Sequence, residues 1–178
     1  MNVPNVLSLA RILLIPLFII LIINKYAGWA LVTFAVAGIT DGIDGLIARV
    51  AHQRTELGAY LDPIADKLLL AAGFVALAIV EILPSWLTVI VLTRDVIILL
   101  GLSVFILTNH RPRMHPSAIS KVTTGFQICT ILLALMKEYH PVLAHLSYLS
   151  IYGTTLFTVL SGAHYISLGA KILNSKAH

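Results

Sequence analysis

Six apolar stretches of about twenty residues follow one another along nearly the whole chain, and this pattern limits the fold more than any other feature. We place them near residues 4–24, 27–50, 57–80, 85–108, 117–138 and 142–169. A helix of this length satisfies its own backbone hydrogen bonds while it crosses the hydrocarbon core of a bilayer. The sequence therefore predicts an all-α integral membrane protein whose six transmembrane helices form a single domain over residues 1–178.

Composition supports this class of protein, because 58% of the residues are hydrophobic and only 11% are charged. Soluble domains contain about a quarter charged residues. The connections are short and contain turn-forming residues, as in Leu83-Pro84-Ser85, so no separate soluble domain is expected. No cleavage site with small residues follows the first apolar stretch, and we expect it to be retained as a helix.

The positive charges predict how the protein is oriented, because Lys and Arg prefer the cytoplasmic flanks of short loops. Most of them flank one side of the predicted helices: Arg11, Arg49, Arg54, Arg111, Arg113, Lys121, Lys171 and Lys176. The other side has only Lys25 and Lys137. This asymmetry predicts that both termini are cytoplasmic, and we expect the inner membrane of a bacterium as the location.

The formal net charge of +4 suits a protein whose basic rim faces the anionic headgroups of membrane lipids. Aromatic residues do not alternate with the basic ones, as they do in many nucleic-acid-binding surfaces. Membrane lipids are therefore the expected partners, and no nucleic acid is expected.

Four aspartates interrupt the apolar pattern. Asp41 and Asp44 lie in the cytoplasmic half of the second predicted helix, and Asp62 and Asp66 lie in the early turns of the third. Spacings of three and four residues place each pair on one helix face, and the short connection brings the two faces together. Charged groups inside a membrane are costly and normally functional, and four converging carboxylates repel one another unless cations neutralise them.

Oxygen ligands favour hard ions, so the four aspartates predict a site for two divalent cations, Mg²⁺ or Mn²⁺, that could clamp phosphoryl oxygens. Gly45, Ala48 and Gly58 lie on or beside the same faces and would let a bulky ligand approach the backbone. The guanidinium of Arg49 suits a phosphate. A purely structural interpretation, with Arg54 and other nearby cations neutralising helix-end carboxylates, explains one aspartate better than four on two facing stripes.

The spacing of these residues resembles the signature of the CDP-alcohol phosphatidyltransferases at Asp41, Asp44, Gly45, Ala48, Arg49, Gly58, Asp62 and Asp66. The opening VPNVLSLAR and the six-helix layout are also similar to that family. The resemblance implies a two-metal site, held by Asp41, Asp44, Asp62 and Asp66, that binds the diphosphate of CDP-diacylglycerol. It implies that Asp66 deprotonates the acceptor hydroxyl, which then displaces CMP. It further implies CDP contacts at Gly45, Ala48, Arg49 and Gly58, and a homodimer.

Four other polar positions carry weaker signals. Asn5 and Ser8 are equally consistent with contacts to the cytidine and with capping of the first helix. Cys129 lies in an apolar span and is predicted to be a small core residue. His164 is predicted to be a hydrogen-bonded histidine of the core.

Four cations are candidates to bind the acceptor or a lipid phosphate: Arg94, Arg111, Arg113 and Lys121. Arg94 is followed by Asp95 inside the fourth predicted helix, so an ion pair between the two is the alternative role for this arginine.

Two branches of the family look closest, and they differ in the acceptor. One makes phosphatidylglycerophosphate from glycerol 3-phosphate, and the other makes cardiolipin from phosphatidylglycerol. The glycerol 3-phosphate enzymes usually carry Gly-Lys-x-Lys-Thr, where this chain has Ser120-Lys121-Val122-Thr123-Thr124. Thr123 thus replaces a lysine that would suit a small phosphate dianion. We expect phosphatidylglycerol as the acceptor, with glycerol 3-phosphate as the alternative, and we expect Thr123→Lys to raise the use of glycerol 3-phosphate.

A divalent-cation transporter is the alternative from another functional class, because clustered carboxylates inside a membrane also bind transported ions. Such a carrier needs metal sites near the middle of the bilayer, with interrupted helices or an internal repeat around them. The sequence shows neither feature, and its aspartates lie toward one side of the membrane.

Overall fold

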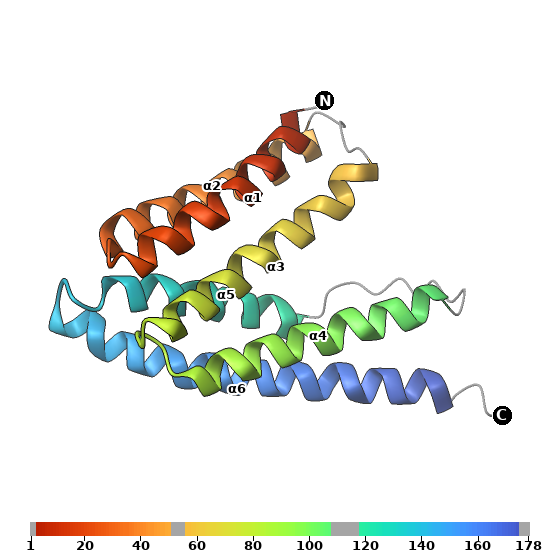
Figure 1. The fold of residues 1–178 in the computed structure, drawn as a ribbon. Coiled ribbons are helices and arrows are strands. Elements are labelled where there is room, and N and C mark those ends of the chain that lie inside the picture. Colours follow the sequence, from red (N-terminus) through yellow and green to blue (C-terminus); the bar gives the residue numbers. More distant parts are fainter. Residues whose placement is uncertain (1–2, 51–55, 108–117, 175–178) are drawn as a thin grey trace.

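The structure is a computed structural model that describes residues 3–50, 56–107 and 118–174, with side chains for residues 9–40, 64–101 and 118–168. All regular structure in these ranges is helical (Figure 1). The helices are α1 (Val3–Ile23), α2 (Ala27–Val50), α3 (Glu56–Ile79), α4 (Ser85–Leu107), α5 (Ala118–Met136) and α6 (Pro141–Asn174). They coincide with the six apolar stretches to within a few residues at each end, which confirms the prediction of six helices.

Two helical segments of the described chain are long and apolar enough by themselves to cross a membrane, Ala118–Met136 and Pro141–Leu168. Leu9–Ile23 and Ala27–Thr40 are shorter apolar helical segments. The count of six spans and the cytoplasmic location of both termini therefore stay predictions.

The helices form two groups that are joined through α3 and α5. Helix α1 packs against α2 and α3, whereas α6 packs against α4 and α5, and the pairs α3–α4 and α2–α5 connect the groups. The three short turns, α1–α2, α3–α4 and α5–α6, gather at one end of the molecule (Figure 1). The start of α1, the end of α2 and the start of α3 lie at the opposite end, so this second end carries the aspartates.

The core lies mainly where α1, α2, α3 and α5 meet, and it extends to Leu87 and Val91 of α4 and Ile151 of α6. The rings of Phe18 and Phe34 have centroids 5.4 Å apart, and both side chains are buried together with Phe74. Gly73 allows α3 to approach α5, because a Cβ atom at this position would lie only 2.9 Å from the Cδ1 of Ile131. This packing sets the position of α3 relative to α1 and α5.

Side-chain hydroxyls connect α5 to α6. The Oγ1 atoms of Thr130 and Thr154 lie 2.7 Å apart. The Oγ1 of Thr130 also lies 3.2 Å from the carbonyl oxygen of Ser150, and that of Thr154 lies 3.1 Å from the carbonyl oxygen of Phe126. Gly153 keeps the helices close, since a Cβ there would lie 2.7 Å from the Phe126 ring. Small residues and interhelical hydroxyl bonds are typical of helix packing in membranes.

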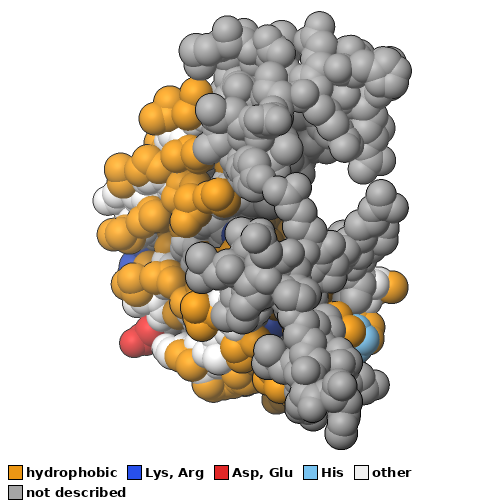
Figure 2. Space-filling model, turned by 90° about the vertical axis from the view of Figure 1, so that its right-hand side faces the viewer, with side chains coloured by type: hydrophobic (Ala, Val, Ile, Leu, Met, Phe, Trp, Pro, Cys, Tyr) orange, Lys and Arg blue, Asp and Glu red, His pale blue; other side chains and the backbone are white. Residues whose placement is uncertain are grey.

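The outer surface is strongly apolar. Large hydrophobic side chains are exposed on all six helices, including Leu13 at 73%, Trp29 at 66% and Leu149 at 67%. Figure 2 shows apolar side chains over most of the described part of one face. Soluble monomers rarely expose contiguous apolar areas of this kind, so the surface is suited to contact with lipid.

Two residues expected in the core are exposed, Cys129 and His164, so both expectations were wrong. The physical reason is that α5 and α6 are apolar on more than one side. In such helices an apolar neighbourhood in the sequence does not show which residues face inward.

Candidate active site

The backbone places the four aspartates on two helices, with Asp41 and Asp44 on α2 and Asp62 and Asp66 on α3. Asp66 is the one whose side chain belongs to the described part of the chain. Among the described side chains, no group of three or more His, Cys, Asp or Glu residues is close enough to hold a metal ion. The side chains of the other three aspartates lie outside this part, so their convergence on two cations stays a prediction.

Asp66 is held by an ion pair from the first helix. The Nη1 of Arg11 donates to the Oδ1 of Asp66 over 2.7 Å. Arg11 is only 1% exposed, whereas the side chain of Asp66 is 40% exposed. One end of the carboxylate is therefore fixed toward α1, while the residue keeps an open surface. The charge distribution in the sequence uses Arg11 only as a marker of topology. A charge inside an apolar helix needs a partner, and this is the signal in the sequence that could have indicated the role of Arg11.

The donor set fits hard divalent ions, since carboxylates on α2 and α3 offer only oxygen ligands. Both helices pack on α1, which also supplies the arginine that fixes Asp66. The arrangement therefore suits a cation site between two helices that a third helix holds in place.

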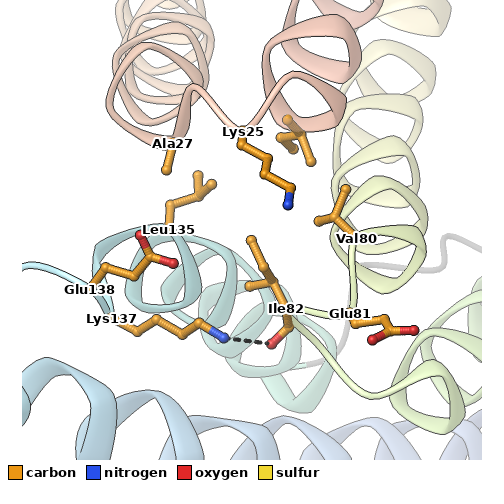
Figure 3. A pocket seen from close by; sticks show the side chains of 9 residues that line it. Lys25, Ala27, Val80, Glu81, Ile82, Leu135, Lys137 and Glu138 are labelled. Carbon is orange, nitrogen blue, oxygen red and sulfur yellow. Dashed lines mark hydrogen bonds between the residues drawn. The ribbon is translucent and has the colours of Figure 1, made fainter.

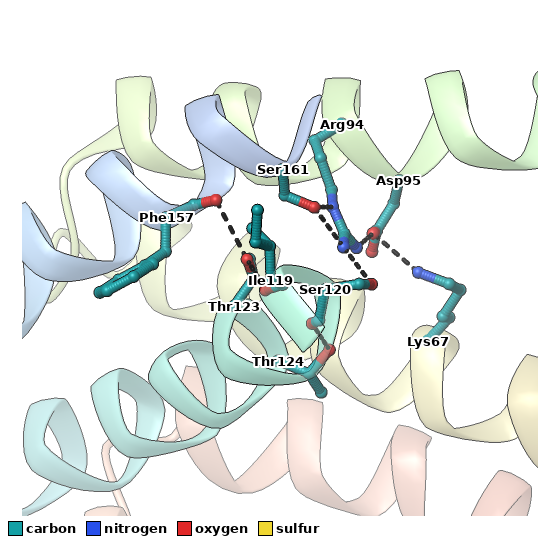
Figure 4. A network of polar contacts seen from close by, with 9 residues as sticks. All are labelled: Lys67, Arg94, Asp95, Ile119, Ser120, Thr123, Thr124, Phe157 and Ser161. Atoms are coloured by element: carbon teal, nitrogen blue, oxygen red, sulfur yellow. Dashed lines mark hydrogen bonds and ion pairs between the residues drawn. The ribbon is translucent and has the colours of Figure 1, made fainter. Parts of the chain in front are cut away.

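A second ionic cluster begins at the next residue of α3 (Figure 4). The Nζ of Lys67 and the Nη1 of Arg94 each lie 2.7 Å from the Oδ1 of Asp95. The Nη2 of Arg94 donates to the hydroxyls of Ser120 at 2.6 Å and Ser161 at 2.9 Å, and its Nε donates to Ser161 at 3.2 Å. The cluster thus connects α3, α4, α5 and α6, and the ion pair considered for Arg94 and Asp95 is present. A role for Arg94 in lipid-phosphate binding stays a prediction.

The two ionic contacts hold consecutive residues of α3. Asp66 pairs with Arg11 on α1, and Lys67 pairs with Asp95 on α4. Because both contacts act within one helical turn, they restrict rotation and sliding of α3 at the level of Asp66. The position of this carboxylate is therefore determined by both groups of helices.

We expect Arg94→Leu to lower the free energy of unfolding by about 3 kcal/mol, because Asp95 would lose its buried partner and two serines would lose a donor. Arg94→Lys should lose less, since it keeps the charge but not the guanidinium that reaches both serines. Thermal unfolding in detergent measures the effect, with Ser167→Ala on the exposed surface of α6 as the control. Equal unfolding temperatures for Arg94→Leu and the wild type would contradict a structural role.

Thr123 is fully buried against α6. Its Oγ1 lies 3.0 Å from the carbonyl of Phe157 and 2.8 Å from that of Ile119, and it donates to both (Figure 4). Our expectation for Thr123→Lys assumed an accessible side chain. A lysine here would place a charge inside the α5–α6 contact, so this substitution would test packing rather than acceptor choice.

The other predicted site residues are placed as follows. Lys121 is exposed on α5. The backbone positions of Asn5 and Ser8 lie on α1, those of Gly45, Ala48 and Arg49 on α2, and that of Gly58 on α3. Their side-chain positions, and Arg111 and Arg113 altogether, are outside the described residues, so their roles stay predictions.

Comparison with known proteins decides the family. The family model described as CDP-alcohol phosphatidyltransferase matches residues 1–160, a range that includes all four aspartates. The chain belongs to the CDP-alcohol phosphatidyltransferase family. It is therefore an enzyme, a transferase of phospholipid synthesis, and this membership argues against the transporter alternative.

Relatives of this phosphatidyltransferase include proteins named for the synthesis of phosphatidylglycerophosphate and proteins named as cardiolipin synthases, which are the two branches that the sequence resembles. A probable phosphatidylglycerophosphate synthase of Mycobacterium tuberculosis (strain ATCC 25618 / H37Rv) is 33% identical over 176 residues, which cover 93% of this chain and 80% of the relative. A cardiolipin synthase (CMP-forming) of Streptomyces coelicolor is 41% identical over 105 residues, which cover 56% of this chain and 49% of the relative. The CDP-diacylglycerol--glycerol-3-phosphate 3-phosphatidyltransferase of Bacillus subtilis is 29% identical over 183 residues, which cover 93% and 94% of the two chains.

Proposed function

We propose that this enzyme transfers a phosphatidyl group from CDP-diacylglycerol to the hydroxyl of phosphatidylglycerol, giving cardiolipin and CMP. The observation that carries the proposal is the family match over residues 1–160, which contains the complete aspartate signature. Relatives named as cardiolipin synthases and as glycerol 3-phosphate enzymes support the donor and leave glycerol 3-phosphate as the alternative acceptor.

The proposal includes an integral membrane protein with six spans, with both termini and the active site on the cytoplasmic side. Three observations support a location in the membrane. They are the two helical segments that are long and apolar enough to cross it, the exposed apolar surface, and the hydroxyl contacts between α5 and α6. The distribution of Lys and Arg supports the orientation. Family resemblance supports a homodimer in the inner membrane of a bacterium.

In this proposal, Asp41, Asp44, Asp62 and Asp66 would hold two Mg²⁺ or Mn²⁺ ions. Bound ions would offset the negative charge of the diphosphate and of the leaving CMP. Arg49 would contact a phosphate, and the small residues Gly45, Ala48 and Gly58 would leave room for the CDP group.

Asp66 would act as the general base. An alcohol is a weak nucleophile, so a carboxylate within hydrogen-bond reach takes its proton as the new oxygen–phosphorus bond forms. The bond between phosphorus and the CMP oxygen breaks, and its electron pair leaves with CMP. Arg11 would be a positioning residue, since its contact with Oδ1 holds the carboxylate in one orientation.

We expect Arg11→Leu to reduce kcat about a hundredfold while KM for CDP-diacylglycerol changes little. The substitution removes the contact that orients the general base, but it removes no group that binds the donor. Arg11→Lys should recover part of kcat, since an ammonium can also pair with Asp66. Steady-state kinetics at several donor concentrations separate the two constants. An equal loss in Arg11→Lys and Arg11→Leu, with lowered unfolding temperatures in both, would indicate a structural role only.

The residue type at position 123 supports a lipid acceptor. At the position where the glycerol 3-phosphate enzymes usually carry their second lysine, this chain has a threonine, whose hydroxyl bonds to the carbonyl of Phe157. A small dianion therefore lacks one charge-assisted hydrogen bond, whose value is about 1.5–3 kcal/mol. A lipid acceptor depends less on this contact, because its acyl chains already hold its headgroup at the interface.

In direct competition, we expect the purified enzyme to use phosphatidylglycerol at least about tenfold better than glycerol 3-phosphate. Radiolabelled CDP-diacylglycerol with equal concentrations of both acceptors gives products that thin-layer chromatography separates. Reactions with each acceptor alone serve as controls. Exclusive formation of phosphatidylglycerophosphate would overturn the assignment of the acceptor and leave the phosphatidyl transfer itself unaffected.

A further inference from the structure

The three short turns lie at the end of the molecule opposite the aspartates (Figure 1). They and the adjoining helix ends line a pocket of about 310 Å³ (Figure 3). Its charged lining consists of Lys25, Glu81, Lys137 and Glu138. The ammonium group of Lys25 reaches into the pocket from the α1–α2 turn, and that of Lys137 reaches in from the end of α5 (Figure 3). Each of the three turns thus contributes at least one charge.

Two of these residues have a backbone conformation that favours glycine. Lys25 has a φ of 61° and Glu81 a φ of 59°, in the turns that end α1 and α3. In the first turn the N–H of Tyr26 donates to the carbonyl of Leu21 over 2.8 Å, and the second turn repeats this pattern. Glycine is the usual residue at such positions, because a side chain there is sterically unfavourable. Charged residues in both strained turns line one pocket, which indicates that their side chains have a function.

The charges of the pocket are not neutralised by direct ion pairs. Within the described chain, Lys25, Glu81 and Glu138 form no ion pair, and the Nζ of Lys137 makes only a long hydrogen bond of 3.5 Å to the carbonyl of Ile82. Two cations and two anions therefore line the pocket, with the carboxylate of Glu81 directed away from its centre (Figure 3). A ligand that itself carries one charge of each sign complements this arrangement better than a simple anion or cation.

A wider hollow of about 600 Å³ adjoins the pocket and shares Lys25 and Glu138 with it. Its lining includes the exposed aromatic residues Tyr26, Trp29 and Tyr139. Tyrosine and tryptophan are enriched at the interface between membrane and water, because their rings combine an apolar body with a polar group. The hollow therefore has the character of a headgroup region.

An apolar stripe continues from this hollow along α2. Trp29, Val32, Val36 and Ile39 are all exposed, and their spacing of three or four residues places them on one face of the helix. Val32 belongs both to the stripe and to the lining of the hollow. A charged pocket, an aromatic rim and an apolar stripe thus follow one another, as the parts of a phospholipid do.

We propose that this end of the protein binds one phospholipid with a zwitterionic headgroup, at a site separate from the catalytic one. The phosphate lies between Lys25 and Lys137, the ammonium group of the headgroup faces Glu138, and an acyl chain lies along α2. This inference depends on the membrane location proposed above and not on the acceptor or on metal ions.

The two tryptophans of the chain allow a direct test, because brominated acyl chains quench tryptophan fluorescence on contact. Trp29 lines the hollow, whereas Trp86 is exposed at the start of α4, at the same end of the molecule. Trp86→Phe leaves Trp29 as the reporter of the site, and Trp29→Phe leaves Trp86 as the reporter of general lipid contact. With brominated phosphatidylcholine in detergent micelles, Trp29 should be half quenched at a lipid fraction about tenfold lower than Trp86.

Lys25→Gly in the Trp86→Phe background makes the test specific. Glycine suits the backbone at this position, so the unfolding temperature should not fall, while the lipid fraction for half quenching of Trp29 should rise about fivefold. Lys171→Gln, which removes one positive charge elsewhere, should leave the titration unchanged. The proposal is overturned if both tryptophans are quenched alike, if Lys25→Gly keeps the titration of the Trp86→Phe parent, or if brominated phosphatidylglycerol binds as well as phosphatidylcholine. Absence of quenching at both tryptophans would overturn the membrane location as well.

Discussion

Asp41→Asn, Asp44→Asn and Asp62→Asn should each reduce turnover by about two to three orders of magnitude. Each substitution keeps the shape of the side chain but removes one negative charge from the predicted cation site. Two divalent ions bound among four carboxylates require these charges, and the developing charge on phosphate and CMP requires the ions. The loss should therefore appear in kcat and in metal affinity together.

Release of CMP from CDP-diacylglycerol and phosphatidylglycerol measures turnover with Mg²⁺, with Mn²⁺ or with a chelator. Titration of Mn²⁺ alone, followed by electron paramagnetic resonance, measures metal binding without catalysis. Thr33→Val is the matched control on α2, because its exposed hydroxyl bonds only to the Trp29 carbonyl of its own helix. Near-normal turnover of the wild type in chelator, or unchanged Mn²⁺ binding in all three variants, would contradict the two-metal site.

Asp66→Asn should lower kcat by about 10²- to 10⁴-fold and change the affinity for CDP-diacylglycerol much less. An amide cannot accept the proton of the acceptor hydroxyl, whereas three carboxylates would remain to hold the cations and the donor. The contact with Arg11 makes this variant informative, because an amide oxygen can still accept the hydrogen bond from Nη1 and the side chain should keep its place.

Binding of CDP-diacylglycerol without acceptor separates the two roles of Asp66, and unfolding temperatures show whether the contact with α1 is kept. Asp66→Ala is the comparison variant, since it removes the hydrogen bond to Arg11 as well as the base. If donor affinity falls in proportion to kcat in Asp66→Asn, this residue is mainly a metal ligand and the general base must be another group.

Helix positions and the aspartate signature follow from the sequence alone. The length of an apolar stretch predicts a helix that can cross a bilayer, because this length depends only on consecutive residues of the sequence. Likewise, the intervals from Asp41 to Asp44 and from Asp62 to Asp66 are local, and the helical repeat converts them directly into shared faces. The family could be inferred from these local intervals, and the match over residues 1–160 confirms it.

Contacts between helices were decided only by the tertiary structure. The ion pair between Arg11 and Asp66 joins residues 55 positions apart, and the hydroxyl of Thr123 lies 3.0 Å from the carbonyl of Phe157 on α6. Cys129 and His164 face outward although their surroundings in the sequence are apolar. In a helix of a soluble protein, one side is polar and the opposite, apolar side faces the core. Helices that are apolar on several sides do not show in this way which side faces inward. Which side chains meet was therefore determined by the packing of small residues, hydroxyls and buried charges across helices, a property of no single segment of the chain.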